Sequence, residues 1–261
     1  MTQRIALGIE YDGSRYCGWQ YQDHSPSVQE KVEQALAFVA NHEVRVSCAG
    51  RTDTGVHALA QVVHFDTDAV RSDHAWVLGG NANLPEDITV LWAKQMPANF
   101  HARFSAVRRL YRYVIFNRPM RPAILAKRVS WEYRPLQIER MREATQYLIG
   151  EHDFSSYRAL ACQAKSPVRT LHRLDISRHC DMVILELEAN GFLHHMVRNI
   201  AGVLMKIGAG EADPAWAREV LEQRDRTQGG VTASPHGLYF VTAYYPDQYS
   251  IPALLPPAGV W

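Results

Sequence analysis

The order in which strand-like and helix-like patterns follow one another constrains the fold of this chain most. Alternating apolar and polar residues indicate strands, and apolar residues three or four apart indicate helices. In the first part of the chain these patterns predict strands over 5–11, 44–48, 61–65 and 88–93, and helices over 28–39 and 73–80. The first helix follows a capping box formed by Ser27 and Glu30. The resulting order is strand, helix, strand, strand, helix, strand.

The second part of the chain repeats this order loosely. Strands are predicted over 108–117, 169–178, 182–188 and 238–245, and helices over 136–149, over 192–207 and near Pro214. Two βαββαβ units in tandem predict an α/β protein of the α+β type, with two ferredoxin-like halves and a largely antiparallel mixed sheet. We expect the halves to be residues 1–105 and 106–261, joined near Ser105. A proline-rich tail over 246–261 is expected to cover the surface or a second subunit.

The composition of the 261 residues excludes several classes of protein. With 47% hydrophobic and 21% charged residues, the chain is neither disordered nor collagen-like nor a coiled coil. No window approaches the roughly 18 uncharged apolar residues of a membrane span, and the first apolar run is too short for a signal peptide. Cys17, Cys48, Cys162 and Cys180 have the spacing of neither a zinc site nor a disulfide framework. We therefore expect a reduced, soluble, cytoplasmic protein that does not bind membranes.

The positive charges of the chain are concentrated in one stretch, although the formal net charge is only +1. Residues 88–131 contain no Asp or Glu. Their basic residues are Lys94, Arg103, Arg108, Arg109, Arg112, Arg118, Arg121, Lys127 and Arg128. Such a local excess predicts a basic surface that binds a polyanion. The alternative is a solvated face whose counter-charges come from elsewhere in the fold.

Motifs that bind common cofactors are missing from the sequence. There is no Walker loop, no H-E-x-x-H and no G-x-S-x-G, and Gly208-Ala-Gly210 lacks the third glycine of a dinucleotide-binding loop. The adjacent His194 and His195 are the most suggestive metal ligands. Because neighbouring residues of a helix point about 100° apart, we expect these two side chains not to share one ion.

The segment with the most chemical content is the loop over 49–58, Ala-Gly-Arg-Thr-Asp-Thr-Gly-Val-His-Ala. Gly50 and Gly55 allow backbone conformations that other residues avoid. In an extended stretch Arg51 and Asp53 point the same way, and a carboxylate beside a guanidinium stays ionised, as a nucleophile or base must. The alternative is an ordinary Asx turn, in which Asp53 bonds its own loop backbone.

Residues 50–58 of this loop resemble the signature of the tRNA pseudouridine synthase A family. Further segments in the family's order extend the resemblance along nearly the whole chain. They are Tyr11-Asp12-Gly13-x-x-Tyr16-x-Gly18-Trp19-Gln20, Phe100-His101-Ala102-Arg103, Tyr111-Arg112-Tyr113, His194-His195-Met196-Val197-Arg198-Asn199 and Gly237-Leu238-Tyr239. The departure is Thr54, where the family pattern has a small residue such as Ala.

The resemblance implies isomerisation of uridine to pseudouridine at positions 38, 39 and 40 of the tRNA anticodon stem-loop. It also implies a homodimer that works without cofactor or catalytic metal, with the active-site cleft between the two halves. Carried over by residue, the nucleophile is Asp53, the tyrosine that stacks on the target base is Tyr111, and the arginine that pairs with the aspartate is Arg198. Arg51 is implied to help displace the base from its stack.

Each of these residues also has a structural interpretation. Strand alternation puts Arg109, Tyr111, Tyr113 and Ile115 on one face, which we expect to be outward and able to bind a flipped base. Tyr111 would otherwise be a sheet tyrosine packed under a loop, and Arg198 a surface arginine bonded to a helix carbonyl. The segment from Tyr11 to Gln20 either contacts RNA or packs locally through Tyr16 and Trp19.

Two other functions are compatible with parts of the sequence. Ferredoxin-like sheets also bind single-stranded RNA without catalysis, although the RNP1 pattern is missing. A hydrolase that uses Asp53 with His57 as general base is the other alternative, without a serine or cysteine nucleophile in a matching motif. Incubation with uridine-labelled tRNA discriminates among isomerised, unchanged and cleaved RNA. The residues leave open whether the carboxylate attacks C6 of uracil or C1′ of ribose.

Overall fold

The computed structural model describes residues 2–252, which form two compact units. The first unit comprises residues 2–107 and 239–252, and the second comprises 108–238. The division after residue 107 lies close to the junction that we expected near Ser105. The last strand differs from expectation, because it belongs to the first unit and not to the second. This strand, β10 (Leu238–Tyr244), runs parallel to β3 (His57–Thr67), with Tyr239 opposite His57.

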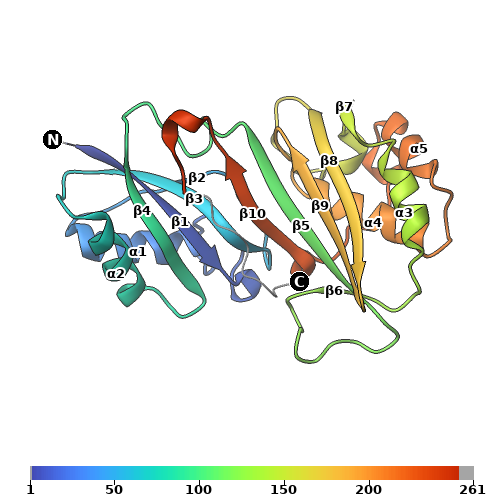
Figure 1. Ribbon diagram of the computed structural model, residues 1–261, viewed down its shortest axis with the longest axis horizontal. Coiled ribbons are helices and arrows are strands. Elements are labelled where there is room, and N and C mark those ends of the chain that lie inside the picture. Colours follow the sequence, from blue (N-terminus) through green and yellow to red (C-terminus); the bar gives the residue numbers. More distant parts are fainter. Residues whose placement is uncertain (1, 253–261) are drawn as a thin grey trace. The chain divides into compact units, whose positions relative to one another are not determined.

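The first unit contains the βαββαβ order that the sequence predicts (Figure 1). Its remaining elements are β1 (Gln3–Tyr11), α1 (Val28–Ala40), β2 (Ser47–Cys48), α2 (Asp73–Asn83) and β4 (Ile88–Met96). Antiparallel pairing gives the strand order β4-β1-β3, and β2 and β10 both pair with β3. The loop between β2 and β3 carries Asp53.

Side chains from both helices and the sheet form the core of the first unit. The Oγ of Ser27 accepts a hydrogen bond from the backbone N–H of Glu30, which confirms the predicted start of α1. Val28, Val32 and Leu36 on this helix are buried as expected. Trp76 of α2 is fully buried and meets Phe65 of β3 edge-on, with ring centroids 5.1 Å apart. These contacts pack both helices and β3 into one core.

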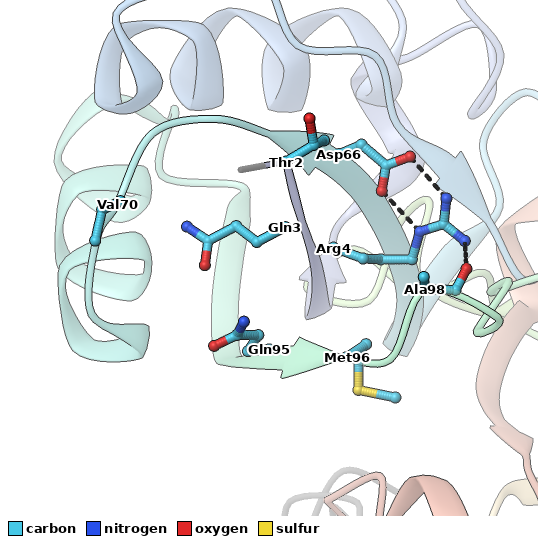
Figure 2. A pocket seen from close by; sticks show the side chains of 8 residues that line it. All are labelled: Thr2, Gln3, Arg4, Asp66, Val70, Gln95, Met96 and Ala98. Atoms are coloured by element: carbon cyan, nitrogen blue, oxygen red, sulfur yellow. Dashed lines mark hydrogen bonds and ion pairs between the residues drawn. The ribbon is translucent and has the colours of Figure 1, made fainter.

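An ion pair holds the far end of the same sheet (Figure 2). The guanidinium of Arg4 on β1 donates to both carboxylate oxygens of Asp66 on β3, each at 2.7 Å. The same side chain donates to the carbonyl oxygens of Ala98 and Phe100, at 2.6 and 2.7 Å. The hydrogen bonds from Arg4 to Asp66 lower the pKa of the Asp66 carboxyl, so the carboxylate stays charged. Arg4 thereby joins β1, β3 and the segment after β4 beside a surface hollow of about 550 Å³.

The second unit is a mainly antiparallel sheet with three helices beside it (Figure 1). Its elements are β5 (Arg108–Asn117), β6 (Ser130–Glu132), α3 (Ile138–Thr145), β7 (Gly150–Asp153), β8 (Val168–His179), β9 (Met182–Ala189), α4 (Met196–Gly208) and α5 (Trp216–Gln223). The strand order is β5-β9-β8-β7, and β6 pairs with β5 in parallel. The predicted strands over 108–117, 169–178 and 182–188 are therefore confirmed.

Helix α4 begins four residues later than the pattern over 192–207 predicts. His195 precedes the helix with a φ of 62°, in the left-handed region, so residues 192–195 are not helical. The apolar stripe of the helix is buried as expected, including Met196, Ile200 and Leu204. Within residues 2–252 the protein is thus of the α+β class with a largely antiparallel sheet. No helix in this range has the length and apolar character needed to cross a membrane.

The tail is only partly covered by the structure. Residues 246–252 lie in the first unit, where the Lys94 ammonium donates to the carbonyl oxygens of Tyr249 and Ser250. The Tyr249 ring packs edge-on against Phe100 at 5.1 Å. This stretch therefore packs on its own unit, and the expectation for the remaining tail, 253–261, lies outside the described residues.

Candidate active site

Asp53 lies on a tight turn between β2 and β3. The backbone N–H of Val56 donates to the carbonyl oxygen of Asp53 at 3.1 Å, and Gly55 at the third position has a φ of 77°. Such a turn favours glycine there, because side chains with a Cβ rarely adopt positive φ. Asp53 is half-buried and Arg51 is exposed, while Thr52 between them is buried. The loop therefore holds its one carboxylate in an ordered backbone and a partly desolvated environment.

A buried glutamine fixes the start of this loop. Gln61 of β3 is fully buried, and its Nε2 donates to the carbonyl oxygen of Gly50 at 2.6 Å. Its Oε1 accepts from the backbone N–H of Gly50 at 3.3 Å. One amide thus satisfies both backbone groups of the first loop glycine. No role was predicted for Gln61 from the sequence; the available signal was a polar residue inside an apolar strand pattern.

The side chain of His57, the first residue of β3, is buried among other residues of the first unit. Its ring is 2% exposed and stacks on Tyr239, with centroids 4.7 Å apart. Its Nδ1 lies 3.1 Å from the backbone nitrogen of Gly13 and from Oδ1 of Asp12. The hydrogen bond with His57 lowers the pKa of the Asp12 carboxyl well below its ordinary range. A ring buried in these contacts argues against His57 as the general base of a hydrolase.

Tyr111 is covered, contrary to the expectation that its face of β5 is outward. The side chain is 8% exposed, and its ring meets Phe192 edge-on with centroids 4.9 Å apart. Tyr113 on the same face is fully buried and donates its hydroxyl to the carbonyl oxygen of Ser234 at 2.8 Å. Loop residues cover this face, which strand alternation alone does not reveal. This packing is compatible with a sheet tyrosine under a loop, and the stacking of Tyr111 on the target base stays a prediction.

Arg198 and its neighbour fasten a loop to helix α4. The Nε of Arg198 donates to the carbonyl oxygen of Ala233 at 2.8 Å, and the N–H of Ala233 returns a bond to the Arg198 carbonyl at 3.2 Å. The Oδ1 of Asn199 accepts from Thr232 and Arg226 at 2.7 and 3.0 Å. The Nε of Arg198 thus bonds a loop carbonyl. Asn199, 2% exposed, is a second anchor that the motif contained without an assigned role.

The two adjacent histidines are arranged differently from the helical expectation. His194 and His195 lie in the turn before α4, and their ring centroids are 4.1 Å apart. The prediction that their side chains point about 100° apart was wrong, because it assumed a helix that starts only at Met196.

The basic stretch is not a uniform charged surface. On β5, Arg108 pairs with Glu188 at 2.6 Å, and Arg112 pairs with Glu186 at 2.7 Å, both on β9. These glutamates lie far along the sequence and supply the counter-charges that the alternative interpretation required. The loop between β5 and β6 differs, because Arg118, Arg121, Lys127 and Arg128 are all exposed there.

The predicted site residues fall into two groups. Asp53 and Arg51 belong to the first unit, and Tyr111 and Arg198 belong to the second. Within the first unit, Asp53 shares its loop with Arg51; within the second, Tyr111 lies on β5 and Arg198 on α4. The pairing of Asp53 with Arg198 stays a prediction.

Comparison with known proteins decides the family. The profile described as tRNA pseudouridine synthase matches residues 8–105 and 144–246, which include the aspartate loop and helix α4. The chain belongs to the tRNA pseudouridine synthase family. It is 62% identical to the tRNA pseudouridine synthase A of Pseudomonas aeruginosa, over 96% of this chain and 88% of that protein. It is 58% identical to the tRNA pseudouridine synthase A of Nitrosococcus oceani, over 99% of this chain and all of that protein.

A solved structure of a Cbf5-Nop10-Gar1 complex has a weaker similarity to this chain. The match covers 90% of this chain and 48% of that one, with 9% identity and a TM-score of 0.36. A similarity this low adds nothing to the assignment of the family.

Proposed function

We propose that Asp53 is the nucleophile with which this pseudouridine synthase isomerises uridine in tRNA, and that its targets are positions 38, 39 and 40 of the anticodon stem-loop. The observation that carries the assignment of Asp53 is its place on the turn between β2 and β3, which contains Gly55 at a positive φ. A carboxylate there is half-buried, and the backbone around it is held by Gln61 and by the Val56 hydrogen bond. A fixed carboxylate attacks without first losing conformational freedom.

The isomerisation of uridine to pseudouridine involves no change of oxidation state. The bond from C1′ of ribose to N1 of uracil breaks, the base rotates, and a bond from C1′ to C5 forms. N1 gains a proton and C5 loses one, so the product contains the same atoms as the substrate. A carboxylate promotes the first step by attack either at C6 of the ring or at C1′ of the sugar. The isomerisation consumes no co-reactant.

The other site residues have complementary proposed roles. A uridine within a helical stem must leave the stack, which costs a few kcal/mol and favours an aromatic surface that receives the base. We assign that surface to Tyr111, and displacement of the base to the exposed Arg51. Arg198 is proposed to pair with Asp53, because an adjacent guanidinium favours the charged carboxylate. The bond from its Nε to Ala233 already fixes the stem of this side chain.

The same proposal includes a homodimer located in the cytoplasm and active without cofactor. The resemblance of the sequence segments to the family's motifs supports the dimer and the absence of a cofactor. The cysteine spacing supports a reducing compartment.

The proposal is tested with anticodon stem-loops that contain uridine at only one of the three positions and carry tritium at its C5. Isomerisation at position 38, 39 or 40 releases the tritium and yields pseudouridine on nucleoside analysis. Unchanged RNA that still binds would support a non-catalytic RNA-binding protein, and a shortened RNA would support a hydrolase. Pseudouridine on nucleoside analysis without release of tritium, which places the modification at a uridine elsewhere in the stem-loop, would contradict the assigned positions.

We expect turnover to survive exhaustive chelation. The close pair His194 and His195 makes this a necessary test, because neutral imidazoles are common metal ligands. The substrate is a pre-folded stem-loop, so that loss of magnesium from the RNA does not obscure the result. Loss of turnover that zinc restores would contradict a metal-free reaction.

Replacement of Arg121 by Ala is expected to weaken tRNA binding and lower the slope of log K against log salt by about one. Arg121 is exposed on the loop between β5 and β6, within the stretch that lacks acidic residues. Turnover at saturating tRNA should not change, because a phosphate contact that is equal in ground and transition states affects binding alone. The quantity measured is the dissociation constant at several salt concentrations.

The control variant is Arg142→Ala, which removes one exposed arginine paired with Glu139 on α3. Arg108 and Arg112 should not change the slope either, since both pair with glutamates of β9. An unchanged slope for Arg121→Ala would exclude a phosphate contact by Arg121.

A further inference from the structure

The segment between β1 and α1 packs directly on the Asp53 turn. The backbone N–H of Trp19 donates to the carbonyl oxygen of Thr52 at 3.0 Å, and the N–H of Gly55 donates to the carbonyl oxygen of Tyr16 at 3.3 Å. These two hydrogen bonds bracket Asp53 on both sides. The Trp19 and Tyr16 side chains are 1% and 6% exposed, so this segment packs locally through its aromatic residues.

Gly18 lies directly against the backbone of residues 52–54, which carries Asp53. A Cβ at this position would lie 2.7 Å from the carbonyl oxygen of Thr52, 3.1 Å from the carbonyl carbon of Asp53 and 3.2 Å from the nitrogen of Thr54. The first distance is shorter than a carbon–oxygen contact allows. All three neighbours are backbone atoms, so the clash can be relieved only by moving one chain segment against the other. Gly18 also has a φ of 93°, which glycine alone adopts without strain.

A side-chain hydrogen bond reinforces the same contact. The hydroxyl of Tyr11 and Oγ1 of Thr52 lie 2.7 Å apart, and both side chains are buried. Burial raises the pKa of Tyr11, so the hydroxyl keeps its proton and stays available for this bond. Thr52, the residue before Asp53, is therefore held through its side chain by Tyr11 and through its carbonyl by Trp19.

We propose that Gly18 is a positioning residue for the isomerisation: its missing side chain lets the segment from Tyr11 to Trp19 seat against residues 52–54 and fix the direction in which Asp53 presents its carboxylate. The inference rests on the proposed role of Asp53 as nucleophile. Gly18 acts through the backbone of the loop and contacts neither the base nor the RNA. Its effect therefore belongs to the chemical step and not to tRNA binding.

The test is Gly18→Ala, compared with Gly210→Ala as a matched control. Gly210 has a similar φ of 79°, but a Cβ there would come no closer than 3.9 Å to its nearest neighbour, Nε2 of Gln137. Both variants place a Cβ at a positive φ, and only the first displaces the Asp53 loop. We expect Gly18→Ala to lower kcat by about tenfold or more with an unchanged dissociation constant for tRNA. Gly210→Ala should keep the kcat of the unaltered protein.

Two results with Gly18→Ala would overturn the proposal. One is an unchanged kcat in a folded variant. The other is a weaker tRNA affinity with full turnover at saturating tRNA, which would place the segment on the RNA surface. If Gly18→Ala does not fold, the proposal is tested with Tyr11→Phe, which removes only the hydroxyl that bonds Thr52. A fall in kcat of about threefold or more at unchanged Tm and tRNA affinity supports positioning; an unchanged kcat contradicts it.

Asp53→Asn measured in parallel distinguishes this inference from the assignment on which it rests. An inactive Asp53→Asn beside a fully active Gly18→Ala leaves the nucleophile in place and rejects the positioning role. An active Asp53→Asn rejects the nucleophile itself, whatever Gly18→Ala shows.

Discussion

Asp53→Asn abolishes isomerisation and leaves tRNA affinity nearly unchanged: this is the largest effect that we expect from a single substitution. The amide keeps the shape of the carboxylate and much of its hydrogen bonding, but it is a very poor nucleophile. Because Asp53 is half-buried on a turn closed by its backbone carbonyl, the substitution leaves the loop in place. The measurement is single-turnover release of tritium from C5, together with the dissociation constant for the same stem-loop.

Thr54→Ala is the matched control for this variant. Thr54 is the exposed next residue of the same turn, and its side chain has no proposed role. It should keep full turnover. Asp53 is not the nucleophile if Asp53→Asn keeps more than about a tenth of the turnover of the unaltered protein.

The second large effect is expected at Tyr111, where Ala should remove most turnover. Lost base stacking accounts for about 1–3 kcal/mol. Truncation of a buried aromatic residue also costs about 3–5 kcal/mol of folding stability, and Tyr111 is 8% exposed against Phe192. The free energy of unfolding therefore has to be measured beside kcat, and turnover compared at a temperature at which the variant is fully folded.

Tyr111→Phe separates the contribution of the ring from that of the hydroxyl. It keeps the ring, its contact with Phe192 and the stacking surface, and it removes only the hydroxyl. Full activity would assign Tyr111 to stacking alone, whereas a large loss would assign a proton-transfer role to the hydroxyl. A folded Tyr111→Ala with normal turnover would contradict any role for Tyr111 in catalysis.

The elements of the fold that local patterns determine were predictable. Ser27 and the spacing of Val28, Val32 and Leu36 located α1, because capping and helical periodicity are properties of neighbouring residues. The start of β3 at His57 was missed, because the polar His57 and Gln61 obscure its alternation. The place of β10 in the first unit was missed as well. It depends on pairing with β3, far away in sequence, which no local pattern contains.

The candidate site was predictable as motifs but not as packing. The resemblance selected the loop with Asp53, and the structure adds the contacts that hold it, from Gln61 and Gly18. Alternation on β5 placed Tyr111 and Tyr113 on one face correctly, yet it does not say what covers that face. The pairing of Arg112 with Glu186 was not predicted either, because it depends on the register between β5 and β9, which the local pattern does not contain.

The central claim, that Asp53 drives isomerisation at positions 38, 39 and 40, is tested most directly by one side-by-side measurement. A tRNA with uridine at all three positions is incubated with equal amounts of folded wild-type protein and Asp53→Asn, and pseudouridine is mapped by position. We expect pseudouridine at these positions with the wild-type protein and none with the variant at equal RNA occupancy. Pseudouridine at the same positions with both proteins would contradict the claim.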